Sequence, residues 1–192
     1  MPTDAPISSD TQSTQSKSSL RIPKKQYYLQ IAKEVSQRAT CMCAHFGALI
    51  VKDDQIISTG YNGAPRMTKD CYELGFCLRR KLQIPSGTQY ELCRSVHAEQ
   101  NAIINAARAG VSLLNADLYL YGERVMEGQT GLLKAYPCFI CKKMILNAGI
   151  KRLFANDEKG ELIEYSVEEW TDNWAKNDMI EDTQKYSANY KK

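Results

Sequence analysis

Apolar residues recur with two different spacings along this 192-residue chain. The three-to-four-residue spacing that is typical of amphipathic helices predicts helices over 25–38, 98–108, 139–147 and 168–176. Short β-branched or alternating runs predict strands over 47–52, 55–59, 116–121 and 150–155, and the first two read as a hairpin. Strands that alternate with helices predict an α/β fold, in which helices cover both faces of a sheet in three α/β/α layers.

The ends of the pattern suggest one domain. Residues 1–20 are rich in Ser, Thr and Gln and hold almost no bulky apolar residue, so we expect a disordered N-terminal tail. Residues 21–192 are expected to form a single domain, because a chain of this length fits one core. Residues 66–94 show no strong period, although structureless connectors of this length are uncommon in compact domains.

Composition narrows the classes of function. The net charge is +3, and no basic run is interleaved with aromatic residues, which argues against a nucleic-acid partner. No apolar stretch approaches the ~18–20 residues that cross a bilayer, and the N-terminus lacks the apolar segment of a signal peptide. The seven cysteines include a C-x-x-C pair, which suits reduced, metal-binding thiols. We therefore expect a cytoplasmic protein with no membrane partner.

The chemistry is concentrated in two motifs, His97-Ala98-Glu99 and Pro137-Cys138-Phe139-Ile140-Cys141. One imidazole and two thiolates supply three zinc ligands and leave the fourth position open, as hydrolytic zinc sites require. Glu99 is close enough to the histidine to lie beside the metal and move protons without binding it. A lone C-x-x-C also occurs in redox pairs and structural zinc sites, but the two motifs in this order form the signature of zinc nucleobase deaminases. We predict a catalytic Zn²⁺ on His97, Cys138 and Cys141, with Glu99 as the catalytic residue.

Across about residues 31–154, the chain resembles the deoxycytidylate (dCMP) deaminases of the cytidine deaminase superfamily. The resemblance rests on the motifs above and on the surrounding runs, Gly60-Tyr61-Asn62-Gly63-Ala64-Pro65 and Cys93-Arg94-Ser95-Val96-His97-Ala98-Glu99-Gln100-Asn101-Ala102. It implies a cytidine-deaminase-like domain with a central mixed sheet. It also implies that Asn62 hydrogen-bonds the substrate sugar and that the backbone of Ala98 contacts the base. The alternative for Asn62 is a turn residue, since Asn before Gly is a common turn pair.

The implied reaction is the zinc-dependent hydrolysis of dCMP to dUMP and ammonia, which supplies thymidylate synthesis. Zinc lowers the pKa of water from about 15.7 to near 7, and Glu99 would carry the proton of that water to N3 of cytosine. The partner is then a small-molecule nucleotide, and we expect a homo-oligomer. A phosphate needs a cation or a helix end at the mouth of the pocket, and the nearest cations in sequence are Arg66 and Arg94.

One departure from the family is large. In the family, the strand that corresponds to 116–121 runs almost directly into the Pro-Cys motif, whereas residues 122–136 intervene here. This insertion borders the metal motif, so it could be a lid, an oligomer contact or a cap that changes the substrate. A second hypothesis is therefore a deaminase of another small nucleoside, nucleotide or heterocycle. Editing of tRNA or another nucleic acid is disfavoured by the modest charge.

Five cysteines remain outside the catalytic motif, and three of them lie in the aperiodic segment 66–94. A second, structural zinc would order a segment that has no core of its own. The first-choice ligands are Cys41, Cys71, Cys77 and Cys93, and some family members hold a second zinc at positions that correspond to the first two. The alternative is buried free thiols that act as small hydrophobic side chains.

Overall fold

The computed structural model describes residues 21–85 and 88–177. Helices and strands follow in the order α1 (Lys24–Ser36), β1 (Ala44–Lys52), β2 (Gln55–Tyr61), α2 (Cys71–Leu74), α3 (Leu78–Lys81), the 3₁₀ helix η1 (Tyr90–Leu92), α4 (Ala98–Arg108), β3 (Asp117–Met126), β4 (Gln129–Leu132), α5 (Phe139–Asn147), β5 (Arg152–Asn156), β6 (Leu162–Ser166) and α6 (Val167–Asn177). The tail predicted at 1–20 and the last part of the predicted domain, 178–192, lie outside the described residues.

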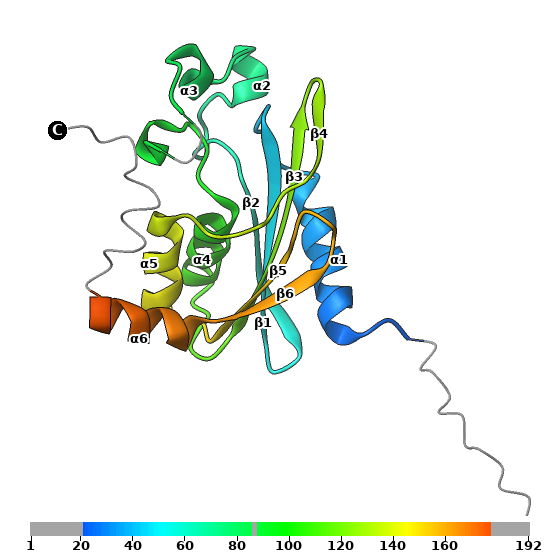
Figure 1. The fold of residues 1–192 in the computed structure, drawn as a ribbon, viewed down its shortest axis with the longest axis vertical. Coiled ribbons are helices and arrows are strands. Elements are labelled where there is room, and N and C mark those ends of the chain that lie inside the picture. Colours follow the sequence, from blue (N-terminus) through cyan, green and yellow to red (C-terminus); the bar gives the residue numbers. More distant parts are fainter. Residues whose placement is uncertain (1–20, 86–87, 178–192) are drawn as a thin grey trace, which may run out of the picture.

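One mixed sheet forms the middle layer (Figure 1). Its strand order is β2-β1-β3-β5-β6, and β4 pairs with β3 off this path. β1 is antiparallel to β2 and β3, whereas β3 and β5 are parallel and are joined through α5. Helix α1 lies on one face, and α4, α5 and α6 lie on the other. The predicted three-layer α/β/α fold with a central mixed sheet is therefore confirmed.

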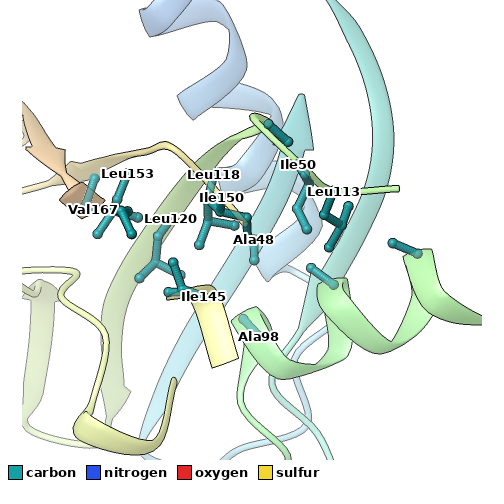
Figure 2. Packing of buried hydrophobic residues seen from close by; sticks show 14 of the residues in the cluster. Ala48, Ile50, Ala98, Leu113, Leu118, Leu120, Ile145, Ile150, Leu153 and Val167 are labelled. Atoms are coloured by element: carbon teal, nitrogen blue, oxygen red, sulfur yellow. The ribbon is translucent and has the colours of Figure 1, made fainter. Parts of the chain in front are cut away.

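Alternating side chains of the strands build one core on each face of the sheet. On the α1 side, the packed residues are Tyr28, Leu29, Ala32, Leu49, Val51, Tyr119, Tyr121 and Phe154. Their neighbours in β1 and β3 point the other way, where Ala48, Ile50, Leu118 and Leu120 pack against Ala98 of α4 and Ile145 of α5 (Figure 2). This period of two is expected for a strand that is buried on both faces.

Helix α4 lies unusually close to the sheet because β2 carries glycine at the crossing. A Cβ atom at Gly60 would meet the backbone of α4 at Ala98 and Ala102, with the Ala102 Cα only 2.9 Å away. Gly47 of β1 plays the same part on the opposite face, where a Cβ would meet the α1 backbone at Ala32 and Ser36. The backbones of the two helices therefore pack directly against the glycines of the sheet. This contact fixes the start of α4, where His97 and Glu99 lie.

The structure also departs from the predicted elements. Strand β3 was expected to end at 121 but continues to Met126, and it folds back through Gly128 (φ +74°) into β4. The insertion 122–136 is therefore largely a β-hairpin that extends the sheet. Strand β6 was not predicted, and the aperiodic segment 66–94 holds only the short helices α2, α3 and η1. Among the described residues, no helix is long and apolar enough to cross a membrane.

Candidate functional site

Both metal motifs lie at the starts of helices that point toward the same place. His97 immediately precedes α4 with an extended backbone, and its N–H donates to Oε1 of Gln100 at 2.9 Å. Cys138 holds the corresponding place before α5, and Cys141 lies in the first turn of that helix. Because the N-terminus of a helix carries partial positive charge, both helices favour anionic ligands at this point. The chain thus gathers thiolates where the backbone stabilises them.

The predicted ligands converge. Nδ1 of His97 lies 3.4 Å from Sγ of Cys138 and 3.4 Å from Sγ of Cys141. A tetrahedral zinc with ordinary Zn–N and Zn–S bonds places nitrogen and sulfur about 3.5 Å apart, so the spacing fits this ion. Within the described part of the chain, these three residues are the only His, Cys, Asp or Glu group whose ligand atoms all lie within 4.8 Å of one another. The predicted zinc site on these three residues is confirmed.

The charges around this site are set by burial and by short contacts. Glu99 is only 4% exposed, and burial raises the pKa of its carboxyl above the ordinary value. The pKa of the Cys138 thiol is lowered by hydrogen bonds from Cys141 and from His97. Burial alone would lower the pKa of His97, but the bond to Cys138 and the Glu99 charge raise it overall. Glu99 is thus a buried, protonatable group beside the ligands.

These residues line a cavity of about 400 Å³, which falls in the usual range for small-molecule sites. Asn62 and Ala98, the predicted substrate contacts, also line it. The Asn62 amide is partly used by the fold, because its Oδ1 accepts from the Phe46 N–H at 2.7 Å and its Nδ2 donates to the Ala44 carbonyl at 2.9 Å. The side chain therefore ties the end of β2 to the start of β1 while it faces the cavity.

Sequence reasoning missed Tyr90, which lies directly against a zinc ligand. Its ring meets the His97 ring edge-on at 88°, with ring centroids 5.1 Å apart. The Arg79 guanidinium lies 4.8 Å from the Tyr90 ring centroid, and its Nη2 donates to the carbonyls of Pro85 and Thr88. No motif or period marks Tyr90 or Arg79, because both lie in the aperiodic segment 66–94. Their place depends on how that segment folds over the site.

Neither predicted phosphate ligand lines the zinc cavity. Arg66 donates to Oδ1 of Asn105 at 3.2 Å, along α4. Arg94 donates to the Lys69 carbonyl and lines a second cavity of about 220 Å³, whose lining also includes His97. The cations of the zinc cavity are instead Arg79, Arg124 and Lys134, of which the last two belong to the 122–136 hairpin. Closeness in sequence to the motifs was a poor guide, because the sheet brings distant segments to the cavity.

Three of the five remaining cysteines, Cys41, Cys43 and Cys93, line the same cavity. Sγ of Cys41 accepts from the Cys43 N–H at 3.4 Å, and the neighbouring Cys41 thiol, followed by burial, raises the pKa of Cys43. Burial and the neighbouring thiols raise the pKa of Cys71 to about 11. No three of these described thiols come within 4.8 Å of one another. Cys43, which the predicted ligand set omitted, lies between Cys41 and Cys77.

Comparison with known proteins agrees with the zinc site that the structure shows. The family described as the cytidine and deoxycytidylate deaminase zinc-binding region matches residues 22–156. The deoxycytidylate deaminase of Mycobacterium phage D29 is 34% identical over 133 residues, which cover 67% of this chain and 90% of that protein. That of Schizosaccharomyces pombe is 32% identical over 127 residues, which cover 66% of this chain but only 35% of the yeast protein.

Among solved structures, the chain is similar to the dCMP deaminase of cyanophage S-TIM5 in complex with dCMP and dUMP. The TM-score is 0.50 and the sequence identity 26%, and the alignment covers 69% of this chain and 80% of that one.

Proposed function

The chain belongs to the cytidine and deoxycytidylate deaminase family, and on that premise we propose that it hydrolyses dCMP to dUMP and ammonia. The observation that carries the proposal is the convergence of His97, Cys138 and Cys141 beside the buried carboxyl of Glu99. A cavity of nucleotide-compatible size opens onto these groups. The similarity to deoxycytidylate deaminases of a phage and a yeast supports this substrate.

The residues of the site divide the work of deamination. When bound, the zinc ion supplies Lewis acidity that makes a water nucleophilic near neutral pH. Glu99 would accept one proton from the attacking water and deliver it to N3 of the cytosine ring. It would then accept the second proton, from the new hydroxyl on C4, and deliver it to the amine that leaves as ammonia. Its burial suits this part, because a raised pKa lets the carboxyl hold a proton between the two transfers. The low exposure also keeps bulk water from competing for that proton.

The walls of the cavity orient the substrate. Asn62 has one amide N–H left after its bond to Ala44, and we assign that donor to the deoxyribose. The α4 backbone begins at Ala98, where free N–H groups are available to the base. Tyr90 packs against His97 and holds the imidazole ring at a fixed angle.

A second, structural zinc stays a prediction, because no three of the described thiols outside the Pro-Cys motif lie within 4.8 Å of one another. The Cys41 and Cys77 thiols lie near enough to raise the pKa of both Cys43 and Cys71, and Cys93 adds to the effect at Cys71. Four thiolates form the ordinary ligand set of a closed structural zinc site. Such an ion would order the segment that carries Arg79 and Tyr90. The predicted cytoplasmic location and homo-oligomeric state stay predictions.

A second candidate is a deaminase of another small nucleotide, nucleoside or heterocycle. It is favoured by one observation, that the 122–136 insertion contributes Arg124, Met126, Leu133, Lys134 and Tyr136 to the lining of the cavity. A wall that differs from the family pattern changes the shape that the substrate must fit.

The experiment is ammonia release from a panel of substrates by the zinc-loaded protein, with Glu99→Gln as the control for chemistry at this site. The panel holds dCMP, deoxycytidine, CMP, dAMP and cytosine. We expect kcat/KM for dCMP to exceed that for deoxycytidine by at least about tenfold, since one charge-assisted phosphate contact contributes ~1.5–3 kcal/mol. Equal turnover of both, or turnover of a purine alone, would contradict the proposal.

A further inference from the structure

The β3–β4 hairpin presents one of its faces to the zinc cavity. In β3, Arg124 pairs with Ala44 of β1, and side chains alternate between the two faces beyond that point. Arg124 and Met126 line the cavity. Glu123 points the other way, where it accepts hydrogen bonds from Gln37 and the Tyr121 hydroxyl. The pairing register therefore fixes the cation, and not the carboxylate, on the catalytic side. Figure 1 shows the hairpin at the same end of the molecule as α2 and α3.

The segment after β4 is held against the sheet by Asn156, which is 2% exposed. Nδ2 of Asn156 donates to the Leu133 carbonyl at 2.9 Å, and the Asn156 carbonyl accepts from the Ala135 N–H at 2.9 Å. Lys134 lies between these two anchored residues and lines the cavity. The backbone of Lys134 is thus fixed on both sides, while its exposed ammonium remains free to reach a ligand.

The cavity carries an excess of positive charge. Its charged lining residues are Arg79, Arg124, Lys134 and Glu99. Nη2 of Arg79 donates hydrogen bonds to two backbone carbonyls. Arg124 donates to a neutral group, Oε1 of Gln129, at 3.0 Å, and the Lys134 ammonium lies 5.9 Å from the Tyr136 ring centroid. Among the described residues, no carboxylate forms an ion pair with Arg124 or Lys134. Two cations that are close to a catalytic cavity and lack counter-ions call for an anionic group on the ligand.

We propose that Arg124 and Lys134 form a phosphate subsite, so that the 122–136 insertion selects a nucleoside monophosphate over the free nucleoside. The inference rests on the proposed function, since it assigns the phosphate of the substrate that the zinc site deaminates. Arginine offers a planar fork that matches two phosphate oxygens, and lysine adds a mobile point charge. Arg66 and Arg94 have no part in this subsite, because neither lines the cavity.

The test measures kcat/KM for dCMP and for deoxycytidine in Arg124→Gln, in Lys134→Gln and in the double variant. The informative quantity is the ratio of the two constants, because deoxycytidine has the same base and sugar but no phosphate. We expect each single substitution to lower the ratio about ten- to a hundredfold, which is the usual effect of one charge-assisted contact. Arg66→Gln and Arg94→Gln remove the same charge outside the cavity and serve as matched controls with an unchanged ratio. Zinc content and thermal unfolding verify that each variant is folded.

The outcomes separate the two proposals. An unchanged ratio in the double variant overturns the phosphate subsite while dCMP deamination stands. A fall of the ratio in Arg94→Gln instead moves the phosphate to the smaller cavity and also overturns it. If the parent protein deaminates a different monophosphate, the proposed substrate fails, and the same ratio against the corresponding nucleoside still decides the subsite. If the parent deaminates only unphosphorylated compounds, both proposals fail.

Discussion

Gly60→Ala tests whether the seating of α4 on the sheet positions the zinc site. Gly60 has an ordinary negative φ, so alanine suits its backbone, and the cost arises only from contact with α4. The new Cβ would lie 2.9 Å from the Ala102 Cα, whereas carbon atoms in contact prefer about 3.5–4.0 Å. Because the Ala102 nitrogen and the Ala98 carbonyl oxygen lie closer still to this Cβ, helix α4 must move away from β2 by roughly 1 Å or more. It carries His97 and Glu99 with it.

Two losses are expected from this shift. Overpacking of this kind costs about 1–3 kcal/mol of unfolding free energy, which urea denaturation measures. A displacement near 1 Å between catalytic groups costs about a hundredfold in rate, so we expect kcat/KM for deamination to fall by that order. Because Cys138 and Cys141 belong to α5 and stay in place, zinc affinity should fall too, and metal analysis after dialysis against a weak chelator would show it.

The matched control is Gly47→Ala, which makes the same kind of clash with the opposite helix. Its Cβ would lie 2.6 Å from the Ser36 backbone nitrogen of α1, and α1 carries no ligand of the site. It should lower stability at least as much, because its Cβ lies closer still to the Ala32 carbonyl oxygen, with zinc content and the activity of the folded fraction retained. If Gly60→Ala kept its zinc and its activity while losing stability, the reasoning that α4 seating positions the site would be refuted.

Three further predictions address the site and the fold. Glu99→Gln should retain zinc, because the carboxyl is not a ligand, yet its deamination rate should fall by about 10²–10⁴ or more. His97→Ala should instead lose metal and activity together. Loss of zinc in Glu99→Gln would show that the role given to Glu99 is wrong. Metal analysis of the purified protein should give two zinc ions per chain and one in Cys71→Ser, and a value of one in the parent would exclude the structural site. The Tyr28 hydroxyl donates to Asp54 at 2.7 Å, and this bond, followed by burial, raises the pKa of Tyr28 to about 12. Since the unfolded value is about 10, the contribution of Tyr28 to stability is complete below pH 10 and is lost as the pH rises toward 12. Urea unfolding between pH 8 and 11 should show this loss, and Tyr28→Phe should make the decline shallower; an equally steep decline would contradict the assignment.

The reaction chemistry was accessible from the sequence because it is local. His97 and Glu99 are two residues apart and lie at the start of the same helix. Cys138 and Cys141 are three residues apart and also lie at the start of one helix. Gln100 and Pro137 mark the beginnings of the same helices. Local spacing of this kind determines both the metal ligands and the elements that carry them, so the α/β pattern and the zinc site were predictable together.

The cationic residues that line the cavity could not be predicted from local spacing. Arg124 reaches the cavity through its pairing with Ala44, and Lys134 is fixed there by Asn156, so both depend on contacts between segments far apart in the chain. Arg66 and Arg94 are nearer in sequence to the motifs, but they donate hydrogen bonds to Asn105 and to the Lys69 carbonyl and do not line the cavity. The spacing of apolar residues along a sequence indicates only which residues are neighbours within one or two turns of the same element. Only the register of the sheet decides which distant side chains share a cavity.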